Sequence, residues 1–332
     1  MRSEGTGVNK IKKVLLTAMI GTLVFSAVGC KMIQKTPEAI QNTVLAKVGD
    51  AKITKADLDE LIDPYIDRYK EQYGEDFTSN SAVQEQVKAL KEEAIGILID
   101  EEILLQKAKE LNLVPEDAEL DKQVEETMAK EKEAYGGEEA FTAALTQSGL
   151  TEETYKEYSK KRIITQLVIE DMTKDVEISD EDVKKYYDEN PTEFTGADIS
   201  HILVTDEAKA KEVKERLVNG EDFATVAKEV SEDTGSKEDG GSIGFTMYNT
   251  TELVPEFVAG MSTLKEGEIS EPIKSDYGYH IIKATGVKVT PFEEIKDATK
   301  TALEQEEKSR IYDENLEKWN KELKVKIYEN RL

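Results

Sequence analysis

Apolar and polar positions recur with three different patterns along this chain. A mostly apolar run, Val14–Val28, follows a basic stretch at residues 9–13. Between residues 55 and 174 the apolar positions recur at spacings of three and four, which predicts amphipathic helices. After residue 197 they form short β-branched runs, which predict strands. The pattern therefore predicts an α+β protein in which a strand-containing segment follows a mostly helical one.

Breaks at Gly74, Pro115 and Gly136-Gly137 divide the helical region into separate helices. In one of them, Ile95, Leu98, Ile99, Leu105 and Ala108 recur at helical spacing and form a single apolar stripe. The helices are expected at residues 55–73, 81–111, 117–134, 138–147 and 151–174.

A β-hairpin is predicted before these helices. Residues Val44–Ile53 alternate around a turn at Gly49-Asp50. Thr54 is expected to cap the first helix, together with Asp57 three residues later. Residues 31–43 are predicted to be a short tether.

The last part of the chain is predicted to return to the helical region. Thr290-Pro291 opens a long amphipathic helix that continues to about Leu323, and residues 325–328 alternate like a strand. The apolar side of the helix must be covered, and a third strand would stabilise a hairpin that is marginal alone. We therefore expect the helix to pack on the N-terminal region and the tail to pair with the hairpin. The apolar side consists of Ile295, Leu303, Ile311, Leu316 and Trp319.

Both histidines of the chain lie beyond a short helix that begins at Ser179 and a predicted linker at residues 190–197. His201 precedes Ile202-Leu203-Val204, and His280 precedes Ile281-Ile282, so each is expected to begin a strand. Because the two histidines occupy the same place in similar strands, we expect neighbouring strands with the imidazoles side by side.

Between the histidines the chain carries an ordered set of short motifs. With the opening Ser200-His201-Ile202-Leu203-Val204, their order resembles that of the parvulin family of peptidyl-prolyl isomerases. The wider chain, including Leu98–Ala108, resembles PrsA-type foldase lipoproteins, with SurA-type periplasmic chaperones as more distant relatives. The motifs are Ser231-Glu232-Asp233, Gly240-Gly241-Ser242-Ile243-Gly244, Leu253-Val254-Pro255-Glu256-Phe257, Gly267-Glu268-Ile269-Ser270-Glu271-Pro272 and Gly278-Tyr279-His280-Ile281-Ile282-Lys283.

The resemblance implies a fold and a division into domains. The expected α+β fold is a parvulin domain, a small antiparallel sheet flanked by helices, inserted in a mostly α-helical chaperone domain. The expected segments are a lipoprotein signal peptide at 1–29, a helical N-terminal chaperone region at 30–196, the isomerase domain at 197–287, and a C-terminal helix and strand at 288–332 that complete the chaperone domain.

The same resemblance assigns roles to seven residues. His201, Asp233 and His280 are expected to be catalytic. Leu253 and Phe257 are expected to receive the proline ring, from one face of a helix because they are four residues apart. Ser275 and Tyr277 match positions that support the histidines.

Three departures from the parvulin pattern concern this site. Leu253 stands where methionine is frequent, Val254 stands where glutamine is frequent, and Ser242-Ile243 replaces an Asp-Leu pair in the glycine turn. The first two change the shape of the pocket and remove a hydrogen-bond donor, so turnover is expected to be modest.

The site residues also have purely structural interpretations. Two strand histidines can be a buried pair that only fixes the sheet, and Leu253 and Phe257 can be core residues. A metal site of two histidines and Asp233 is disfavoured, because adjacent imidazoles already satisfy each other's hydrogen-bonding groups. We expect no metal and no other cofactor.

Isomerisation of a prolyl bond needs no nucleophile. The barrier of about 20 kcal/mol comes from amide resonance. An apolar slot for the proline ring, a polarity that disfavours the planar amide and hydrogen bonds to the twisted peptide suffice to lower it. Phosphate-directed parvulins carry a basic loop after the first strand, where this chain has Thr205-Asp206-Glu207, so a phosphoserine-proline preference is not expected.

The charge of the chain excludes one class of partner. Its 332 residues carry a net charge of −26, and removal of residues 1–29, with four basic and one acidic side chain, leaves −29. Such a field repels phosphate backbones and argues against nucleic-acid binding. It serves either solubility or the attraction of basic clients.

The N-terminal segment indicates export. Val14–Val28 has the length of a signal-peptide core and is short for a membrane span. Cys30 is the only cysteine, which excludes a disulfide within the chain. The run Ser26–Cys30 resembles a bacterial lipobox, so Cys30 is expected to be lipidated and to anchor the mature protein. An ordinary secretory signal with a coincidental cysteine is the alternative.

Together these patterns predict a lipid-anchored, extracytoplasmic foldase on the outer face of a bacterial cell membrane. It would isomerise prolyl bonds and assist the folding of unfolded, newly secreted polypeptides. One alternative is a holdase chaperone whose parvulin domain has lost turnover, and another is a solute-binding lipoprotein with two lobes of alternating strands and helices. The client, the residue before proline and the oligomeric state, with a homodimer among the options, stay open.

Overall fold

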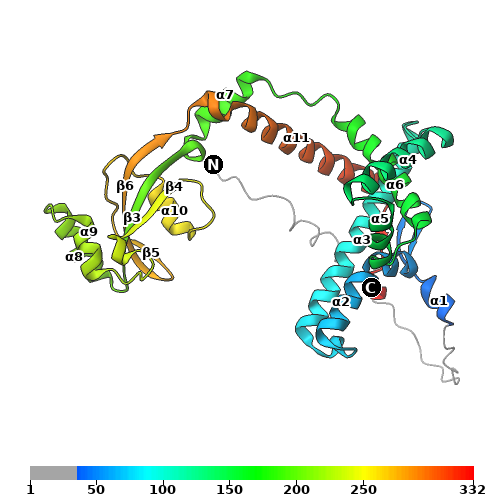
Figure 1. The fold of residues 1–332 in the computed structure, drawn as a ribbon, viewed down its shortest axis with the longest axis horizontal. Helices are drawn as coiled ribbons and strands as arrows, with labels where there is room; N and C mark the ends of the chain where they lie inside the picture. The colour runs from blue at the N-terminus through cyan, green and yellow to red at the C-terminus, as the bar shows by residue number, and fades with distance from the viewer. Residues whose placement is uncertain (1–35) are drawn as a thin grey trace, which may run out of the picture.

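The structure is a computed structural model that describes residues 36–332. The predicted signal peptide, the lipobox-like run and Cys30 lie outside the described residues. Figure 1 shows a mostly helical part and a part built around the sheet of β3 and β6, with the long helix α11 running between them. No helix among residues 36–332 is long and apolar enough to cross a membrane.

The five predicted helices are present, and their ends lie within one residue of the prediction. They are α2 (Lys55–Tyr73), α3 (Ser81–Glu110), α4 (Asp117–Ala134), α5 (Glu138–Gln147) and α6 (Glu152–Thr173). The prediction of a tether at 31–43 is wrong for its last residues, because α1 (Pro37–Gln41) forms there. Thr36 caps it, and Pro37 fits the first helical turn because that position needs no backbone N–H.

The predicted hairpin and the C-terminal strand form one small sheet. Its strand order is β2 (Ala51–Thr54), β1 (Val44–Val48) and β7 (Lys326–Ile327), all antiparallel. Thr54 and Asp57 make the predicted capping box at the start of α2. The pairing of the tail with the hairpin is therefore confirmed.

The core of the helical part lies around α3 and the end of α11 (Phe292–Glu322). Leu45, Ile103 and Val168 are fully buried there, and Trp319 joins them from α11. The buried Lys107 of α3 places its Nζ 5.6 Å from the centre of the Trp319 ring and 2.8 Å from Glu322 Oε2. The predicted contact between the C-terminal helix and the N-terminal region is confirmed at this end of α11.

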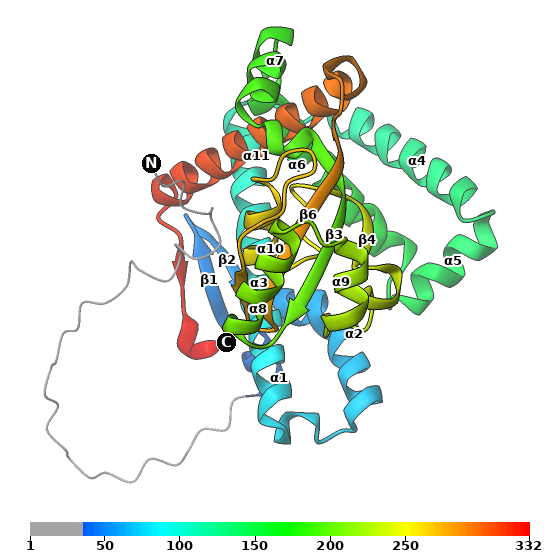
Figure 2. The same cartoon turned by 90° about the vertical axis from the view of Figure 1, so that its left-hand side faces the viewer.

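The second sheet has the strand order β4–β3–β6–β5 and is antiparallel throughout. Figure 2 shows β3 between β6 and β4. One face packs on α8 and α9, and the other on α10, so the sheet separates two apolar clusters. The elements are β3 (Thr195–Val204), α8 (Glu207–Val218), α9 (Phe223–Val230), β4 (Ser242–Met247), α10 (Pro255–Met261), β5 (Ile273–Ser275) and β6 (Gly278–Val289).

Two predictions at the junction of the parts are wrong. Residues 190–197 are not a loose linker, because η3 (Pro191–Phe194) follows α7 (Asp180–Glu189) directly and β3 begins at Thr195. Gly196 is buried in the sheet, where an added Cβ would lie 2.6 Å from the ring of Phe245, so it serves a close approach and not flexibility. The prediction that each histidine begins a strand is also wrong, because β3 begins at Thr195 and β6 at Gly278, which places His201 and His280 inside their strands.

The predicted α+β fold class is confirmed, with a small antiparallel sheet flanked by helices beside a mostly helical part. Two lobes of alternating strands and helices, which a solute-binding protein would need, do not occur in residues 36–332.

Candidate active site

The two imidazoles lie side by side on adjacent strands, as predicted. His201 pairs with Ile282 in the β3–β6 register and His280 pairs with Leu203, so the histidines are diagonal neighbours on one face. Their Nδ1 atoms are 3.3 Å apart, and the ring planes differ by 21°. Both side chains are buried. The pair therefore forms a continuous polar strip within an otherwise apolar sheet face.

Asp233 reaches this pair from the loop after α9. The N–H of Glu232 donates to the carbonyl of Leu203 at 2.7 Å, which fixes the loop to β3. Asp233 Oδ2 then lies 2.9 Å from His201 Nε2. Three further donors surround the carboxylate: the N–H of Gly235, the N–H of Ser236 and the Ser236 hydroxyl.

These donors determine the charge of Asp233. Burial by itself raises the pKa of a carboxyl group, because it disfavours the charged form. Hydrogen bonds from Ser236, His201 and Gly235 together outweigh burial, and the pKa of Asp233 lies below its ordinary value. Asp233 is therefore a carboxylate at neutral pH and accepts every one of these bonds.

Ser275 holds the other end of the histidine pair. Its Oγ lies 2.8 Å from His280 Nε2 and accepts the backbone N–H of Tyr277 at 3.1 Å. Tyr277 is 67% exposed, and it reaches this network through its backbone N–H. Burial, and then the neighbouring His201, lower the pKa of His280 to about 4.

With one proton on each imidazole, a single set of proton positions satisfies all the bonds along this line. Because Asp233 can only accept, His201 donates from Nε2 and accepts at Nδ1. His280 then donates from Nδ1 to His201 and accepts the Ser275 hydroxyl at Nε2. Each ring carries one proton, and the donors all point from Ser275 toward Asp233.

An apolar wall covers the histidine strip. The ring of Phe257 is buried, and its centre lies 5.4 Å from that of His201 and 5.2 Å from that of His280, with its plane nearly perpendicular to both. Leu253 packs in the same apolar cluster. The prediction that both lie on one helix is wrong: Val254 is the N-cap of α10, so Leu253 precedes the helix. Pro255 causes this, because proline disfavours helical backbone at the residue before it.

The glycine turn at Gly240-Gly241 is hydrogen-bonded to the backbone of His201. The N–H of His201 donates to the carbonyl of Gly241 at 2.7 Å. Gly241 has φ +82°, and a Cβ added there would lie 2.3 Å from the carbonyl oxygen of His201. Glycine is needed at this position for both reasons.

All seven predicted site residues lie in the sheet-containing part, and five of them meet: His201, Asp233, Phe257, Ser275 and His280. The sequence patterns did not assign roles to Ser231 and Ser236, which are both buried. Ser231 belongs to the Ser-x-Asp motif, but no pattern marks Ser236. Within residues 36–332, no group of three or more histidine, aspartate or glutamate side chains is arranged to hold a metal ion.

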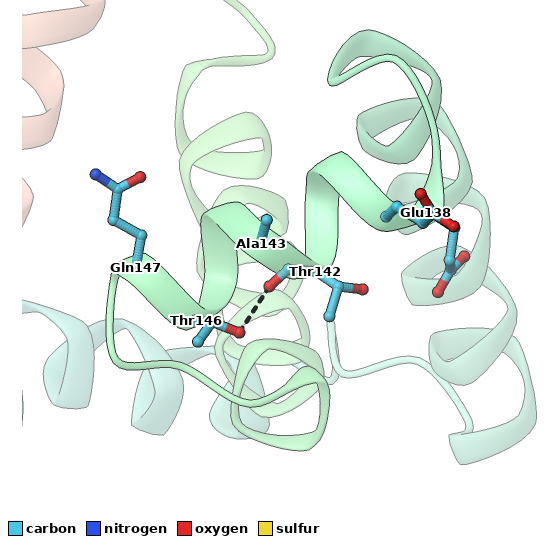
Figure 3. Close-up of a pocket in the computed structure, with 6 residues that line it drawn as sticks. Glu138, Thr142, Ala143, Thr146 and Gln147 are labelled. Carbon is cyan, nitrogen blue, oxygen red and sulfur yellow. Dashed lines mark hydrogen bonds between the residues drawn. The ribbon is translucent and has the colours of Figure 1, made fainter.

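A depression of about 640 Å³ lies elsewhere, over one face of α5 (Figure 3). Glu138, Thr142, Ala143, Thr146 and Gln147 line it, and the Thr146 hydroxyl donates to the carbonyl of Thr142 at 2.9 Å. Glu139 also lines this surface, which belongs to the single helix α5 and carries no histidine beside its two carboxylates. The histidine strip is therefore the candidate active site.

Comparison with known proteins agrees with this division of the chain. A family model described as the SurA-like N-terminal domain matches residues 8–169. A second model, described as the PPIC-type PPIASE domain, matches residues 199–286 and spans both histidines.

Two relatives that match almost the whole of this chain are both named foldase protein PrsA. Foldase protein PrsA of Clostridium botulinum (strain Langeland) is 41% identical over 331 residues, which cover 97% of this chain and 98% of that protein. Foldase protein PrsA of Clostridium kluyveri is 39% identical over 328 residues, covering 94% and 96%. Among solved structures, the peptidylprolyl isomerase PrsA from Bacillus cereus is 28% identical, with a TM-score of 0.45 over 88% of this chain and 96% of that chain.

Identity of this extent along nearly the whole of both chains shows a common family and not only a shared fold. The match to the isomerase model also confirms the parvulin-type fold and activity that the motifs predicted. The chain therefore belongs to the PrsA family of foldases, extracytoplasmic proteins in which a parvulin-type peptidyl-prolyl cis-trans isomerase assists the folding of secreted polypeptides.

Proposed function

We propose that His201, Asp233 and His280 are the catalytic residues of this isomerase and that Leu253 and Phe257 receive the proline ring of the client. Ser275 and the backbone of Tyr277 hold His280 in place. The observation that carries this proposal is the continuous line of hydrogen-bonded side chains from Ser275 through both imidazoles to Asp233, with the Phe257 ring against it.

The arrangement suits rotation about an amide bond. Amide resonance places negative charge on the carbonyl oxygen and double-bond character on the C–N bond. A carboxylate close to that oxygen disfavours the charge-separated form, so Asp233 would weaken the C–N double-bond character of a bound client. The Phe257 ring and Leu253 supply the apolar surface for the pyrrolidine ring, and no covalent step is required.

An isomerase assay with a proline-containing tetrapeptide tests these roles. We expect Asp233→Ala to lower kcat/KM about tenfold or more while the protein still folds, because one aimed electrostatic group is lost. Asp239→Ala, an exposed aspartate of the same loop, is the matched control and should retain full activity. A fully active Asp233→Ala variant with a normal melting temperature would remove Asp233 from the mechanism.

The same assay separates the isomerase from the competing holdase. If the unmodified protein shows no turnover above the uncatalysed rate but suppresses aggregation of an unfolded client, the sheet-containing part is only a binding module. One chain contributes every residue of the proposed site, so the proposal does not require a homodimer. Sedimentation equilibrium distinguishes a monomer from that assembly.

We also propose that residues 30–196 and 288–332 form one chaperone domain into which the isomerase domain, 197–287, is inserted. The strands β3 and β6 extend the inserted sheet to Thr195 and Val289. The pairing of β7 with β1 and the contact of Trp319 with the core around α3 support this division. Unfolded client segments are the partners that the foldase family implies.

Membrane attachment through Cys30 is the last part of the proposal. The lipobox-like run Ser26–Cys30 supports it. We expect Cys30→Ser to release the protein from membranes or to block its maturation, because the thiol that would carry the lipid is lost. Cell fractionation measures this, and a Cys30→Ser protein that remains membrane-bound at its normal size would contradict lipidation.

A further inference from the structure

A buried serine in the Asp233 loop has a contact that the proposed mechanism does not use. Ser236 is 2% exposed, whereas serine is mostly a surface residue. A buried hydroxyl group needs a partner, because it has lost its hydrogen bonds to water. Ser236 finds its partner in Asp233: its hydroxyl and its backbone N–H both donate to Oδ2, the N–H at 3.1 Å.

The backbone of Ser236 also holds the glycine turn. Its carbonyl accepts the N–H of Gly241 at 2.9 Å, and the carbonyl of Gly241 accepts the N–H of His201 at 2.7 Å. Ser236 thus connects the Asp233 carboxylate to β3 at the level of His201. This connection determines where Oδ2 lies relative to the imidazole.

We propose that Ser236 is a positioning residue of the isomerase site, which fixes the Asp233 carboxylate against Nε2 of His201. The inference rests on the role proposed for Asp233. A hydroxyl that donates to a carboxylate forms a stronger bond than one that donates to a neutral acceptor, and it stabilises the charged form. Without that donor, the carboxylate rotates away from His201 and its pKa rises.

Ser231 provides a matched control in the same loop. It is 1% exposed, and its Oγ accepts the backbone N–H groups of Leu203 at 3.2 Å and Asp233 at 3.3 Å. It makes no contact with the carboxylate. Ser231→Ala and Ser236→Ala therefore each delete a buried hydroxyl, but only Ser236→Ala removes a donor to Asp233 Oδ2.

The test compares the mature full-length protein with these two variants. The Asp233 carboxyl is titrated by ¹³C NMR, and kcat/KM is measured as a function of pH. We expect Ser236→Ala to raise the pKa of Asp233 by about one unit, to move the acid limb of the profile by the same amount and to lower kcat about tenfold with KM nearly unchanged. Ser231→Ala should lower the melting temperature and leave both titrations in place. Ser236→Thr, which retains the hydroxyl, should restore the profile.

An unchanged Asp233 titration in Ser236→Ala overturns the proposal, and so does an equal shift in Ser231→Ala. If Ser236→Ala does not fold, the unmodified protein still tests the proposal: an Asp233 pKa at or above its ordinary value of 3.8 overturns it, because the Ser236 donors would then not stabilise the carboxylate. Full activity of Asp233→Ala would remove the catalytic role of Asp233 and leave the titration results standing, so the two failures are distinguishable.

Discussion

His280 owes its protonation state to its surroundings. It is buried, and with one proton on its ring it donates from Nδ1 to His201 and accepts the Ser275 hydroxyl at Nε2. A second proton would have no acceptor at Nε2 unless the Ser275 hydroxyl turned around. This agrees with the direction of its pKa, which burial and the adjacent His201 lower from 6.5 to about 4.

That shift predicts a loss of stability in mild acid. Between pH 6.5 and pH 4 the unfolded chain binds a proton at His280 and the folded protein does not, so the free energy of unfolding falls as the pH falls. The slope from this residue is at most about 1.4 kcal/mol per pH unit. Calorimetry at pH 7.0, 5.5 and 4.5 should therefore show a falling melting temperature for the sheet-containing part, by about 4–8 °C per kcal/mol.

His280→Gln is the control for this prediction, because glutamine does not titrate. Its transition should depend less on pH than that of the unmodified protein within the same window. Asp233 acts in a different range: its pKa is lowered from 3.8, so the stability it contributes is lost only as the pH falls below that value. A melting temperature that is equally steep in His280→Gln would show that other groups cause the decline.

At the scale of elements, the turn before β4 shows how a backbone close contact positions the site. Gly241 and Gly244 have nearly the same positive φ, +82° and +81°. A Cβ at Gly241 would meet the carbonyl oxygen of His201 at 2.3 Å, whereas a Cβ at Gly244 would meet nothing within 4 Å. Alanine substitutions at the two glycines therefore separate two contributions to the loss of stability: the left-handed backbone, which both share, and the steric overlap, which only Gly241 has.

We predict that Gly241→Ala is the more harmful of the two substitutions. Both variants force alanine into the left-handed region, at about 1–2 kcal/mol. Gly241→Ala adds an overlap with the main chain at His201, worth about 1–3 kcal/mol more, and shifts the imidazole. Thermal unfolding and the isomerase assay measure the two effects. Equal stability and activity of the two variants would contradict the contact between the turn and β3.

At the scale of the whole molecule, the segment where the chain leaves the helical part contacts the segment where it returns. The N–H of Thr290 donates to the carbonyl of Phe194 at 2.7 Å, and the Tyr187 hydroxyl donates to the carbonyl of Thr290 at 2.8 Å. The ring of Tyr187 lies 4.9 Å from that of Phe194 and 5.5 Å from that of Phe292. The entry and the exit of the sheet-containing part therefore lie next to each other.

This topology predicts which fragments fold. Residues 191–290 should melt cooperatively, because all four strands of their sheet and its two apolar clusters lie within them. Residues 30–190 should be unstable alone, since they lack β7 and Trp319, and residues 291–332 added in trans should restore them. Trp319 is the only tryptophan, so a blue shift of its fluorescence reports the association.

The control is the peptide 291–323, which retains Trp319 but lacks β7 and should bind less tightly. If residues 30–190 alone melt at the temperature of that part in the whole protein, the inserted-domain proposal is wrong.

Local patterns alone determined much of this protein. The helix ends follow from glycine and proline breaks, and Thr54 and Asp57 signal their own capping box. Such features depend on residues within one turn of each other, so they can be read without the fold. The similar β-branched runs that follow His201 and His280 likewise predicted two neighbouring strands with the imidazoles side by side.

The tertiary structure decided whatever depends on contacts between distant residues. Gly196 lies in a segment whose composition is typical of a linker, but Phe245 packs over it from another strand. Leu253 has helical spacing to Phe257, but Pro255 starts the helix after it. Ser236 carries no motif, and its role appears only where its hydroxyl meets Asp233 beside His201. A one-dimensional pattern records which residues are apolar or polar, whereas burial and hydrogen-bond partners are settled only when separate segments pack together.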